Sequence, residues 1–315
     1  MGKKQKRFLP EIPEVPLAVP IVDNHTHISP DPIPEPGAEL MQRIDADGRL
    51  LMPVLQKTLF SAMEAAGVRG AITSGCEIPE FASTLDLAQH SENIWAAIAL
   101  HPNEAALHAG AVEMSPDGLA HQMESHHREY DLAQAIELTA DLARRAEVVA
   151  VGETGLDYFR TAEAGKEAQK AAFRAHIQLA KELAKPMQIH DRDAHADVVE
   201  ILQRDGAPEK TVFHCFSGDL ELAEICAANG WYASFAGPLT YPVNEHLHRA
   251  FDVLPDELIL VETDAPYLTP VPYRGHPNAS WACVYTAQYM AQRRGVPLES
   301  WCEQLNRNTF AVYGI

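Results

Sequence analysis

Hydrophobic residues in this chain gather in short runs that end in polar residues and alternate with amphipathic stretches. Eight runs rich in Val, Ile and Leu lie at residues 21–27, 68–74, 94–101, 148–156, 186–191, 211–217, 231–236 and 258–263. Continuous apolar runs of this length are typical of strands buried on both faces of a parallel sheet. Helical patterns lie between several of them, for example at 168–185 and at 220–229, where Gly230 follows as a helix stop. Eight strand–helix alternations predict an α/β fold with a single (β/α)8 TIM barrel, and an open doubly wound sheet is the alternative.

The chain divides into a short lead-in and the barrel. Residues 1–19 carry four basic residues among the first seven and then several prolines, so we predict a flexible N-terminal lead-in before a barrel domain at 20–315. Two stretches, 29–52 and 103–146, exceed ordinary loop lengths and follow strand ends, so we expect both beside the mouth of the active site. We expect five histidines at the surface or in supporting positions: His121, His126, His127, His176 and His195.

The composition is that of a globular protein with a large core, since 46% of the residues are hydrophobic and 22% are charged. No apolar run reaches the ~18 residues of a membrane span, and the basic N-terminus leads into Pro-rich rather than apolar sequence. The five cysteines are odd in number and form no CxxC pair, which disfavours a disulfide framework or a cysteine zinc site. We therefore predict a cytoplasmic protein with no membrane association and no obligate protein partner.

The net charge of −19 disfavours a nucleic-acid ligand, because binding to phosphate backbones depends on Lys and Arg. A strongly acidic surface also repels polyanions. Bound divalent cations would have to supply much of the attraction for a phosphate substrate. The net charge alone therefore does not identify the class of substrate.

The strongest local signal is the segment Asp23-Asn-His-Thr-His27 at the end of the first predicted strand. Side chains alternate along a strand, so His25 and His27 point to the same side. Two imidazoles placed in this way can bind one cation. The alternative is a pair of hydrogen-bonded histidines inside the barrel.

Four other predicted strands end in a group of the same kind. Glu153 ends the fourth strand, His190 the fifth, His214 the sixth and Asp264 the eighth. Such groups are costly to bury without partners, and parallel strands bring them to one end of a barrel. Imidazole and carboxylate together suit Zn, Mn, Co, Fe or Mg ions. The pattern predicts a metal site at the C-terminal ends of the strands.

Five segments in order, DNHTH, VGETGLDY, QIHDRDA, FHCFSG and ETDAPYLTP, resemble the signature motifs of the TatD family of metal-dependent deoxyribonucleases, which belong to the amidohydrolase-like barrels. Residues 99–102 and 306–310 also resemble that family, so the likeness extends from residue 21 to residue 310. It implies a two-metal site for Mg, Mn or Zn and a 3′–5′ exonuclease-type deoxyribonuclease that acts on single-stranded DNA or DNA ends.

The resemblance also implies a role for each site residue. His25 and His27 would bind one metal ion, His190 and His214 a second, and Glu153 would bridge the two. Asp264 would hold or deprotonate the attacking water. The chain departs from the family at Asp191, at Tyr241-Pro242 and in the length of 29–52, and these differences concern the substrate rather than the metals.

Four residues near the strand ends are candidates for binding substrate: His101, Arg192, Ser217 and Arg274. Each has a structural alternative: ion pairs with Asp191, Asp193 or Glu262 for the arginines, a plain turn for Ser217, and a structural His-Pro turn for His101.

The same metals could serve an amidohydrolase or esterase that acts on a small molecule or an aminoacyl ester, and the acidic charge favours that alternative. A non-catalytic metal-binding or scaffold protein is a second alternative. The complete set of six ligand candidates disfavours it.

Overall fold

The computed structural model describes residues 8–31, 43–44, 50–51, 54–120 and 122–315. Eight strands form one sheet in the order β1-β4-β5-β6-β7-β8-β9-β10, and every adjacent pair in this order is parallel. Their bounds are β1 Ile21–Thr26, β4 Val68–Gly75, β5 Ile94–Ile98, β6 Val148–Asp157, β7 Met187–Arg192, β8 Thr211–Phe213, β9 Tyr232–Phe235 and β10 Ile259–Val261. The predicted single (β/α)8 TIM barrel is confirmed.

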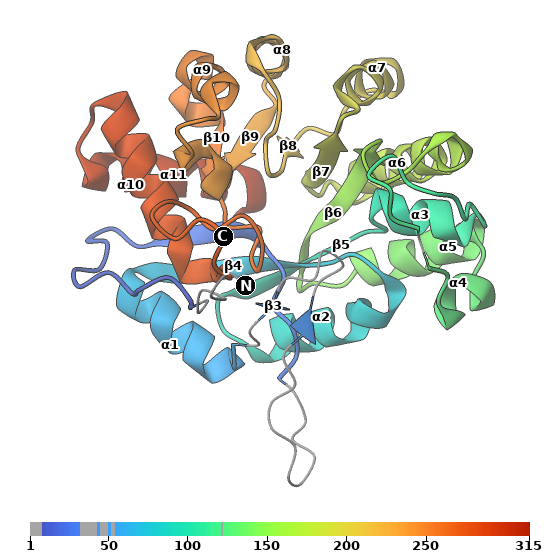
Figure 1. Cartoon of the computed structure of the whole chain (residues 1–315), viewed down its shortest axis with the longest axis horizontal. Helices are drawn as coiled ribbons and strands as arrows, with labels where there is room; N and C mark the ends of the chain where they lie inside the picture. Colours follow the sequence, from blue (N-terminus) through green and yellow to red (C-terminus); the bar gives the residue numbers. More distant parts are fainter. Residues whose placement is uncertain (1–7, 32–42, 45–49, 52–53, 121) are drawn as a thin grey trace, which may run out of the picture.

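Helices follow the strands and surround the barrel (Figure 1). They are α1 Gln56–Ala66, α2 Ile78–His90, α3 Pro102–His108, α4 Ser125–Glu129, α5 Leu132–Ala143, α6 Glu163–Leu183, α7 His195–Asp205, α8 Leu220–Asn229, α9 Glu245–Val253, α10 Cys283–Arg294 and α11 Leu298–Tyr313, with 3-10 turns η1 Gly237–Thr240, η2 Asp256–Leu258 and η3 Ser280–Ala282. None of the helices in the described ranges is both long and apolar enough to cross a membrane.

All eight predicted strands exist, but three of them are clearly shorter than their apolar runs. The strand β8 ends at Phe213 and β10 at Val261, because the chain then turns away from the ladder toward Cys215 and Asp264, which have positive φ angles of 41° and 52°. The strand β5 ends at Ile98, before the turn that leads into α3. The residues after these strands therefore sit in loops above the barrel.

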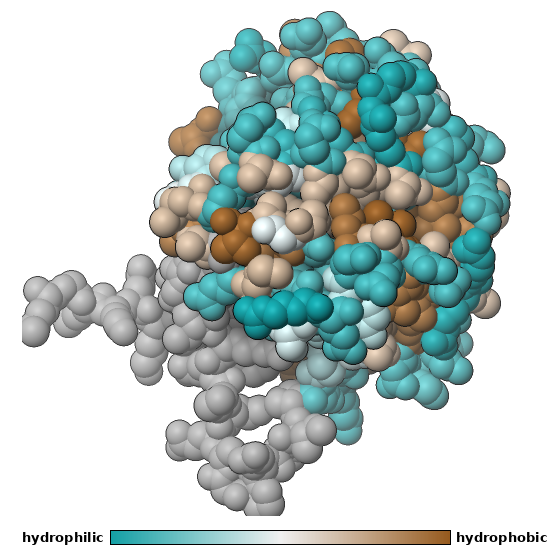
Figure 2. Space-filling view, turned by 90° about the vertical axis from the view of Figure 1, so that its right-hand side faces the viewer, coloured by the Kyte–Doolittle hydropathy of each residue, from teal (hydrophilic) through white to brown (hydrophobic). Residues whose placement is uncertain are grey.

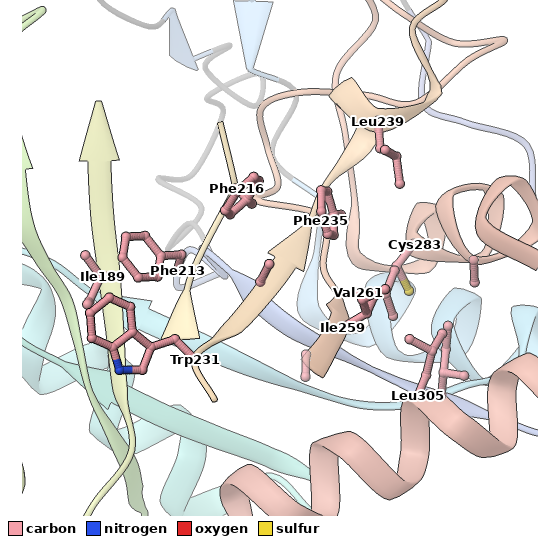
Figure 3. Close-up of a cluster of buried hydrophobic side chains, with 14 of the residues drawn as sticks. Ile189, Phe213, Phe216, Trp231, Phe235, Leu239, Ile259, Val261, Cys283 and Leu305 are labelled. Carbon is pink, nitrogen blue, oxygen red and sulfur yellow. The ribbon is translucent and has the colours of Figure 1, made fainter. Parts of the chain in front are cut away.

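The core lies between the strands and the outer helices. Outward-facing side chains of β7 to β10 and of the turns beside them pack there, as Figure 3 shows for Ile189, Phe213, Phe235 and Val261, together with Leu305 of α11. All of these side chains are buried. A second, smaller apolar cluster, which includes Ile72, Val212 and Leu260, lies on the other face of the strands, and polar groups gather at the strand ends.

Between β1 and β10 the barrel is closed by a side chain as well as by backbone bonds. The Asn24 amide donates to Val261 O at 2.8 Å, and the N–H of Asp264 donates to His25 O at 3.0 Å. The Asp23 carboxylate, whose pKa burial raises to about 8, accepts the N–H of Thr263 at 2.8 Å. These bonds place the end of β1 directly beside Asp264.

The described part of the expected lead-in, residues 8–19, packs on the barrel. Trp281 Nε1 donates to Pro10 O at 3.1 Å, the Tyr285 hydroxyl donates to Glu11 O at 2.7 Å, and Leu17 is buried. Residues in this segment therefore contact the barrel, and the division of the chain into a lead-in and a barrel domain stays a prediction. Residues 1–7 lie outside the described ranges.

The two long stretches differ in how much of them is described. Within 29–52 the described residues include β2 Arg43–Ile44, which pairs antiparallel with β3 Leu50–Leu51. The stretch 103–146 contains most of α3 and all of α4 and α5.

Three histidines that we expected at the surface or in supporting positions, His126, His127 and His176, are buried. Their neighbours come from other elements, which a linear pattern does not reveal. His121 lies outside the described residues.

His176 gives a testable pH dependence of stability. It is fully buried in α6 beside the Thr154 hydroxyl, at 2.7 Å from Nδ1, and burial lowers its pKa from 6.5 to about 4. Between these values the unfolded chain binds more protons than the folded chain, so the free energy of unfolding falls as pH falls, by on the order of 3 kcal/mol. In His176→Gln, denaturant titrations across this window should show a correspondingly smaller fall.

The exposed His90 of α2 is the control, and His90→Gln should keep the wild-type pH dependence. Parallel stability curves for wild type and His176→Gln would contradict the assignment.

Candidate metal centre

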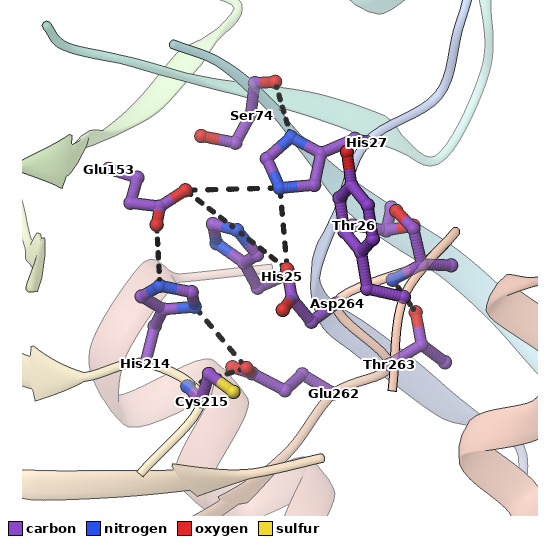
Figure 4. A network of polar contacts seen from close by, with 12 residues as sticks. His25, Thr26, His27, Ser74, Glu153, His214, Cys215, Glu262, Thr263 and Asp264 are labelled. Atoms are coloured by element: carbon purple, nitrogen blue, oxygen red, sulfur yellow. Dashed lines mark hydrogen bonds and ion pairs between the residues drawn. The ribbon is translucent and has the colours of Figure 1, made fainter. Parts of the chain in front are cut away.

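The six residues expected to form the metal site meet at the C-terminal ends of the strands. Five of them, His25, His27, Glu153, His214 and Asp264, fall into overlapping groups of three whose ligand atoms lie within 4.8 Å of one another, and His190 joins them through its contact with Glu153. Figure 4 shows the part of this network around His25, His27, Glu153, His214 and Asp264. The strand ends therefore bring together residues that are up to 240 positions apart in the chain. Asp23 and Thr263 meet in this way at the seam, the place where β1 adjoins β10.

Glu153 lies at the middle of the site, and each of its two oxygens faces a different pair of imidazoles. Oε2 is 3.6 Å from His25 Nε2 and 3.8 Å from His27 Nε2. Oε1 is 2.5 Å from His190 Nδ1 and 2.9 Å from His214 Nε2. A carboxylate placed in this way can bridge two cations, one beside each pair.

Glu153 is charged although it is buried. Burial alone would raise its pKa, but the imidazoles of His214, His101 and His190 outweigh this effect and hold the pKa well below its usual range. The centre of the site thus keeps a negative charge at neutral pH, which favours a bound cation.

Hydrogen bonds fix the His25 ring so that one nitrogen is available to a metal. The Gln188 amide nitrogen donates to Asn24 O and to the Tyr313 hydroxyl, both at 2.9 Å, so the Gln188 oxygen must accept. It accepts from His25 Nδ1 at 2.9 Å, which leaves the lone pair of Nε2 facing the site. Nε2 is buried and has no hydrogen-bond partner among the described residues. A divalent cation would satisfy it, so the residues present fit a metal.

His27 and Asp264 form the outer side of the site. His27 Nδ1 donates to Ser74 O at 3.3 Å, and its Nε2 lies 3.3 Å from Asp264 Oδ1. Burial would raise the pKa of Asp264, but the hydrogen bond with His27 and the nearby imidazoles lower it, so the carboxylate is ionised at neutral pH.

His190 and His214 are oriented by acidic residues on their far sides. His190 Nε2 is 3.2 Å from Asp157 Oδ2, and His214 Nδ1 is 3.4 Å from Glu262 Oε1. Burial alone would lower the pKa of His190, but Asp157 and Glu153 raise it to about 9. A cation that binds His190 must therefore displace a proton.

Sequence reasoning missed four residues that shape the site: Cys76, Asp157, Gln188 and Glu262. Cys76 Sγ lies 3.4 Å from Glu153 Oε2, and burial together with Glu153 raises its pKa to about 12, so it stays a thiol. Of these four residues, Gln188 could have been recognised from the sequence. It is two positions before His190 on a buried strand, so both side chains lie on the inward face.

His101 reaches the same site as a hydrogen-bond donor. Its Nδ1 accepts the N–H of Asn103 at 3.1 Å, so the neutral ring carries its proton on Nε2, 3.6 Å from Glu153 Oε1. Burial and the neighbouring His190 lower the pKa of His101 to about 4. A neutral ring with Nε2–H directed at the centre can donate a hydrogen bond but offers no lone pair to a metal there.

The other three substrate-binding candidates lie at the rim. Arg192 is exposed and stacks on the Phe159 ring, with 3.9 Å from Cζ to the ring centre, and Arg274 is exposed and stacks on Tyr241 at 4.3 Å. In the described part of the chain neither arginine forms the ion pair that was the alternative. Ser217 donates its hydroxyl to Asp191 O at 3.0 Å, which links the ends of β7 and β8.

Comparison with known proteins identifies the family that the chain matches. The profile of the family described as TatD related DNase matches residues 22–314. A Mycobacterium tuberculosis protein named "Uncharacterized metal-dependent hydrolase TatD" is 35% identical over 240 residues, which cover 75% of this chain and 82% of that protein. An Escherichia fergusonii protein named "3'-5' ssDNA/RNA exonuclease TatD" is 30% identical over 261 residues, which cover 80% and 90%.

Solved structures show the same fold. The TatD homologue YJJV from Escherichia coli K12 aligns with a TM-score of 0.72 and 24% identity over 94% of this chain and 98% of that one. A hydrolase of the TatD family from Entamoeba histolytica aligns with a TM-score of 0.68 and 19% identity, over 94% and 99%.

The role of Gln188 can be tested by metal binding. Gln188→Leu removes the acceptor that holds His25 in the metal-binding tautomer, so calorimetric titration of the metal-stripped protein should show affinity about 10–100-fold weaker.

Tyr313→Phe is the matched control, because it removes one partner of the Gln188 amide nitrogen but leaves the oxygen that His25 needs. Equal metal affinity in all three proteins would show that Gln188 does not orient His25.

Proposed function

The chain belongs to the family of TatD related DNases and is a metal-dependent hydrolase, and from this premise we propose that it is a deoxyribonuclease that shortens single-stranded DNA from its 3′ end at a two-metal site. Its metal ligands in this proposal are His25, His27, Glu153, His190, His214 and Asp264, and the ions are Mg, Mn or Zn. The polarity and the single-stranded substrate are supported by the name of the Escherichia fergusonii relative, "3'-5' ssDNA/RNA exonuclease TatD".

The observation that carries the proposal is the division of Glu153 between two imidazole pairs. A site for one metal ion would need imidazoles beside only one of the two Glu153 oxygens. When bound, two divalent cations supply Lewis-acid chemistry, since they activate water and neutralise charge on a phosphate. The phosphodiester bond is a substrate that uses both effects.

The protein's own residues would move protons and orient the phosphate. Asp264 is an ionised carboxylate next to both first-strand histidines, at 3.3 Å from His27 Nε2 and 3.9 Å from His25 Nε2, and would accept the proton of the attacking water. His101 would donate its Nε2–H to a phosphate oxygen, because its neutral ring cannot accept at that atom. This donor adds no charge to the site.

Three rim residues would hold the nucleotide end. The Tyr267 ring is 6.3 Å from the His27 ring and 41% exposed, so a base can stack on it. Arg192 and Arg274 keep their guanidinium groups in place by stacking on aromatic rings, and they offer N–H donors to phosphates. Among the described residues, two exposed arginines suit contact with one end of a strand, because binding along a strand would need more basic side chains.

The main test is hydrolysis of an end-labelled single-stranded DNA oligonucleotide. Metal-stripped protein should not cleave it, protein resupplied with Mg, Mn or Zn should shorten it stepwise from the 3′ end, and Glu153→Ala should lose at least about 10³-fold in rate because the bridging carboxylate is gone. Glu200→Ala, at an exposed position of α7, is the control and should retain wild-type activity.

The acidic net charge of −19 favours a second substrate class, a small-molecule amide or ester. If the protein takes up metal but cleaves no DNA with any of the three ions, the nuclease proposal fails. A panel of amide and ester substrates then becomes the next assay.

The role of His101 makes a separate kinetic prediction. His101→Ala should lower kcat by about 10²–10³-fold, the usual cost of removing one preorganised donor, while His101→Gln keeps an N–H donor and should lose less than about tenfold. The measurement is kcat on the DNA substrate at saturating metal. Equal losses in the two variants would mean that His101 acts through packing and not through its N–H.

A further inference from the structure

Four side chains with metal-ligand chemistry meet outside the proposed catalytic centre. Glu104 and His108 belong to α3, and His126 and His127 belong to α4. One atom from each lies within 4.8 Å of the others, and the three imidazoles are buried. Figure 1 places α3 and α4 at the outer edge of the barrel, and Figure 2 looks onto this side of the molecule, where a belt of apolar side chains crosses a largely hydrophilic face.

His108 has a nitrogen that the protein itself leaves unsatisfied. Its Nδ1 is 2.7 Å from Tyr130 O, and a carbonyl oxygen can only accept, so Nδ1 carries the proton. Nε2 then holds a lone pair, and it is buried with no hydrogen-bond partner in the described ranges. Burial lowers the pKa of His108, so the ring stays neutral and this lone pair stays available. A buried lone pair of this kind is the donor that a metal ion uses.

His127 has the opposite tautomer and a different role. Its Nδ1 accepts the N–H of Glu124 at 2.9 Å, so Nε2 carries the proton and donates it to Glu104 Oε2 at 2.8 Å. A metal ion at Nε2 would require the proton to leave. His127 is therefore placed to orient the carboxylate of Glu104, as hydrogen bonds to metal-binding carboxylates commonly do.

His126 lies at a distance from Glu104 that suits a shared ion. Its Nε2 is 3.3 Å from Glu104 Oε2. Two ligand atoms on one tetrahedral zinc ion, each about 2.0–2.1 Å from it, lie about 3.4 Å apart. The pair already has nearly this spacing, and a ring nitrogen of His108 lies within 4.8 Å of both ligand atoms.

The surroundings are acidic. In the described part of the chain the ion-pair partners of Glu104 are the two α4 imidazoles and not Lys or Arg. Burial raises the pKa of Glu77 to about 7, and the charges of Glu104, Glu80 and Glu124 add to that rise. Several carboxylates thus share this region, which favours a cation at its centre.

We propose that Glu104, His108 and His126 bind a zinc ion that is separate from the catalytic centre and joins α4 to α3, with His127 orienting the carboxylate. Two imidazoles and one carboxylate suit zinc better than Mg or Ca, which prefer oxygen ligands. The helix α4 has five residues and α3 has seven, and helices this short are unstable alone. The ion would contact both turns of α3, through Glu104 and His108, and would hold α4 against this helix, whose N-cap residue is His101.

Zinc counting tests the site. Metal-stripped protein is dialysed against buffered zinc and its zinc is measured by mass spectrometry, for wild type, Glu104→Gln, His126→Gln and the surface control His90→Gln. Both cluster variants should hold one zinc ion fewer per chain than wild type, and His90→Gln should match wild type. Glu104→Gln is nearly isosteric and can still accept from His127, so it decides the outcome if His126→Gln fails to fold.

Amide exchange gives a second readout that is independent of hydrolysis. Zinc at about ten times its Kd should slow exchange in α4 about tenfold in wild type and not in Glu104→Gln. Equal zinc content in wild type and Glu104→Gln, or exchange in α4 that zinc does not change, would overturn the proposal. Neither result bears on DNA cleavage, so this test and the test of the nuclease can fail separately.

Discussion

Glu153 holds a negative charge inside the barrel because imidazoles from three other strand ends surround it. A buried carboxylate is costly without partners, and the imidazoles that end β1, β7 and β8 offset this cost. One group in the site remains unsatisfied without a cation, since the Nε2 of His25 has no hydrogen-bond partner in the described structure. The strand ends supply the ligands, and the negative charge of Glu153 determines the position at which a metal ion binds most favourably.

The seam between β1 and β10 transmits this constraint to Asp264. The Asn24 side chain bonds to β10, and the backbone of Asp264 bonds to His25, so the first and last strands hold their site residues in register. Gln188 uses the same seam, because it contacts Asn24 and the C-terminal helix while it orients His25. Polar bonds at the closing point of the barrel thus set the geometry of the site, while apolar packing outside it supplies stability.

Strand ends were readable from the sequence because apolar runs followed by His, Glu or Asp are a local pattern, and the structure brings all six expected ligands together. Gln188 and Asp157 escaped notice because their roles depend on partners in other strands. The burial of His126 and His127 depends on α4 packing beside α3, which no periodicity encodes. The shortness of β8 and β10 follows from the positive φ angles of Cys215 and Asp264, and neither residue is a glycine that would signal such a turn.

The net charge of −19 and the metal centre are both consistent with contact at the phosphate of the reacting bond. Affinity along a nucleic-acid strand requires many basic contacts, and among the described residues Arg192 and Arg274 are exposed arginines that each stack on an aromatic ring. In the proposed nuclease, attraction for phosphate would then come chiefly from the metal ions that the imidazole pairs would hold. Such attraction acts on the phosphate at the reacting bond and not on distant ones. In the described ranges few basic side chains could hold a strand away from that bond, so the proposed nuclease would release its product after each cut.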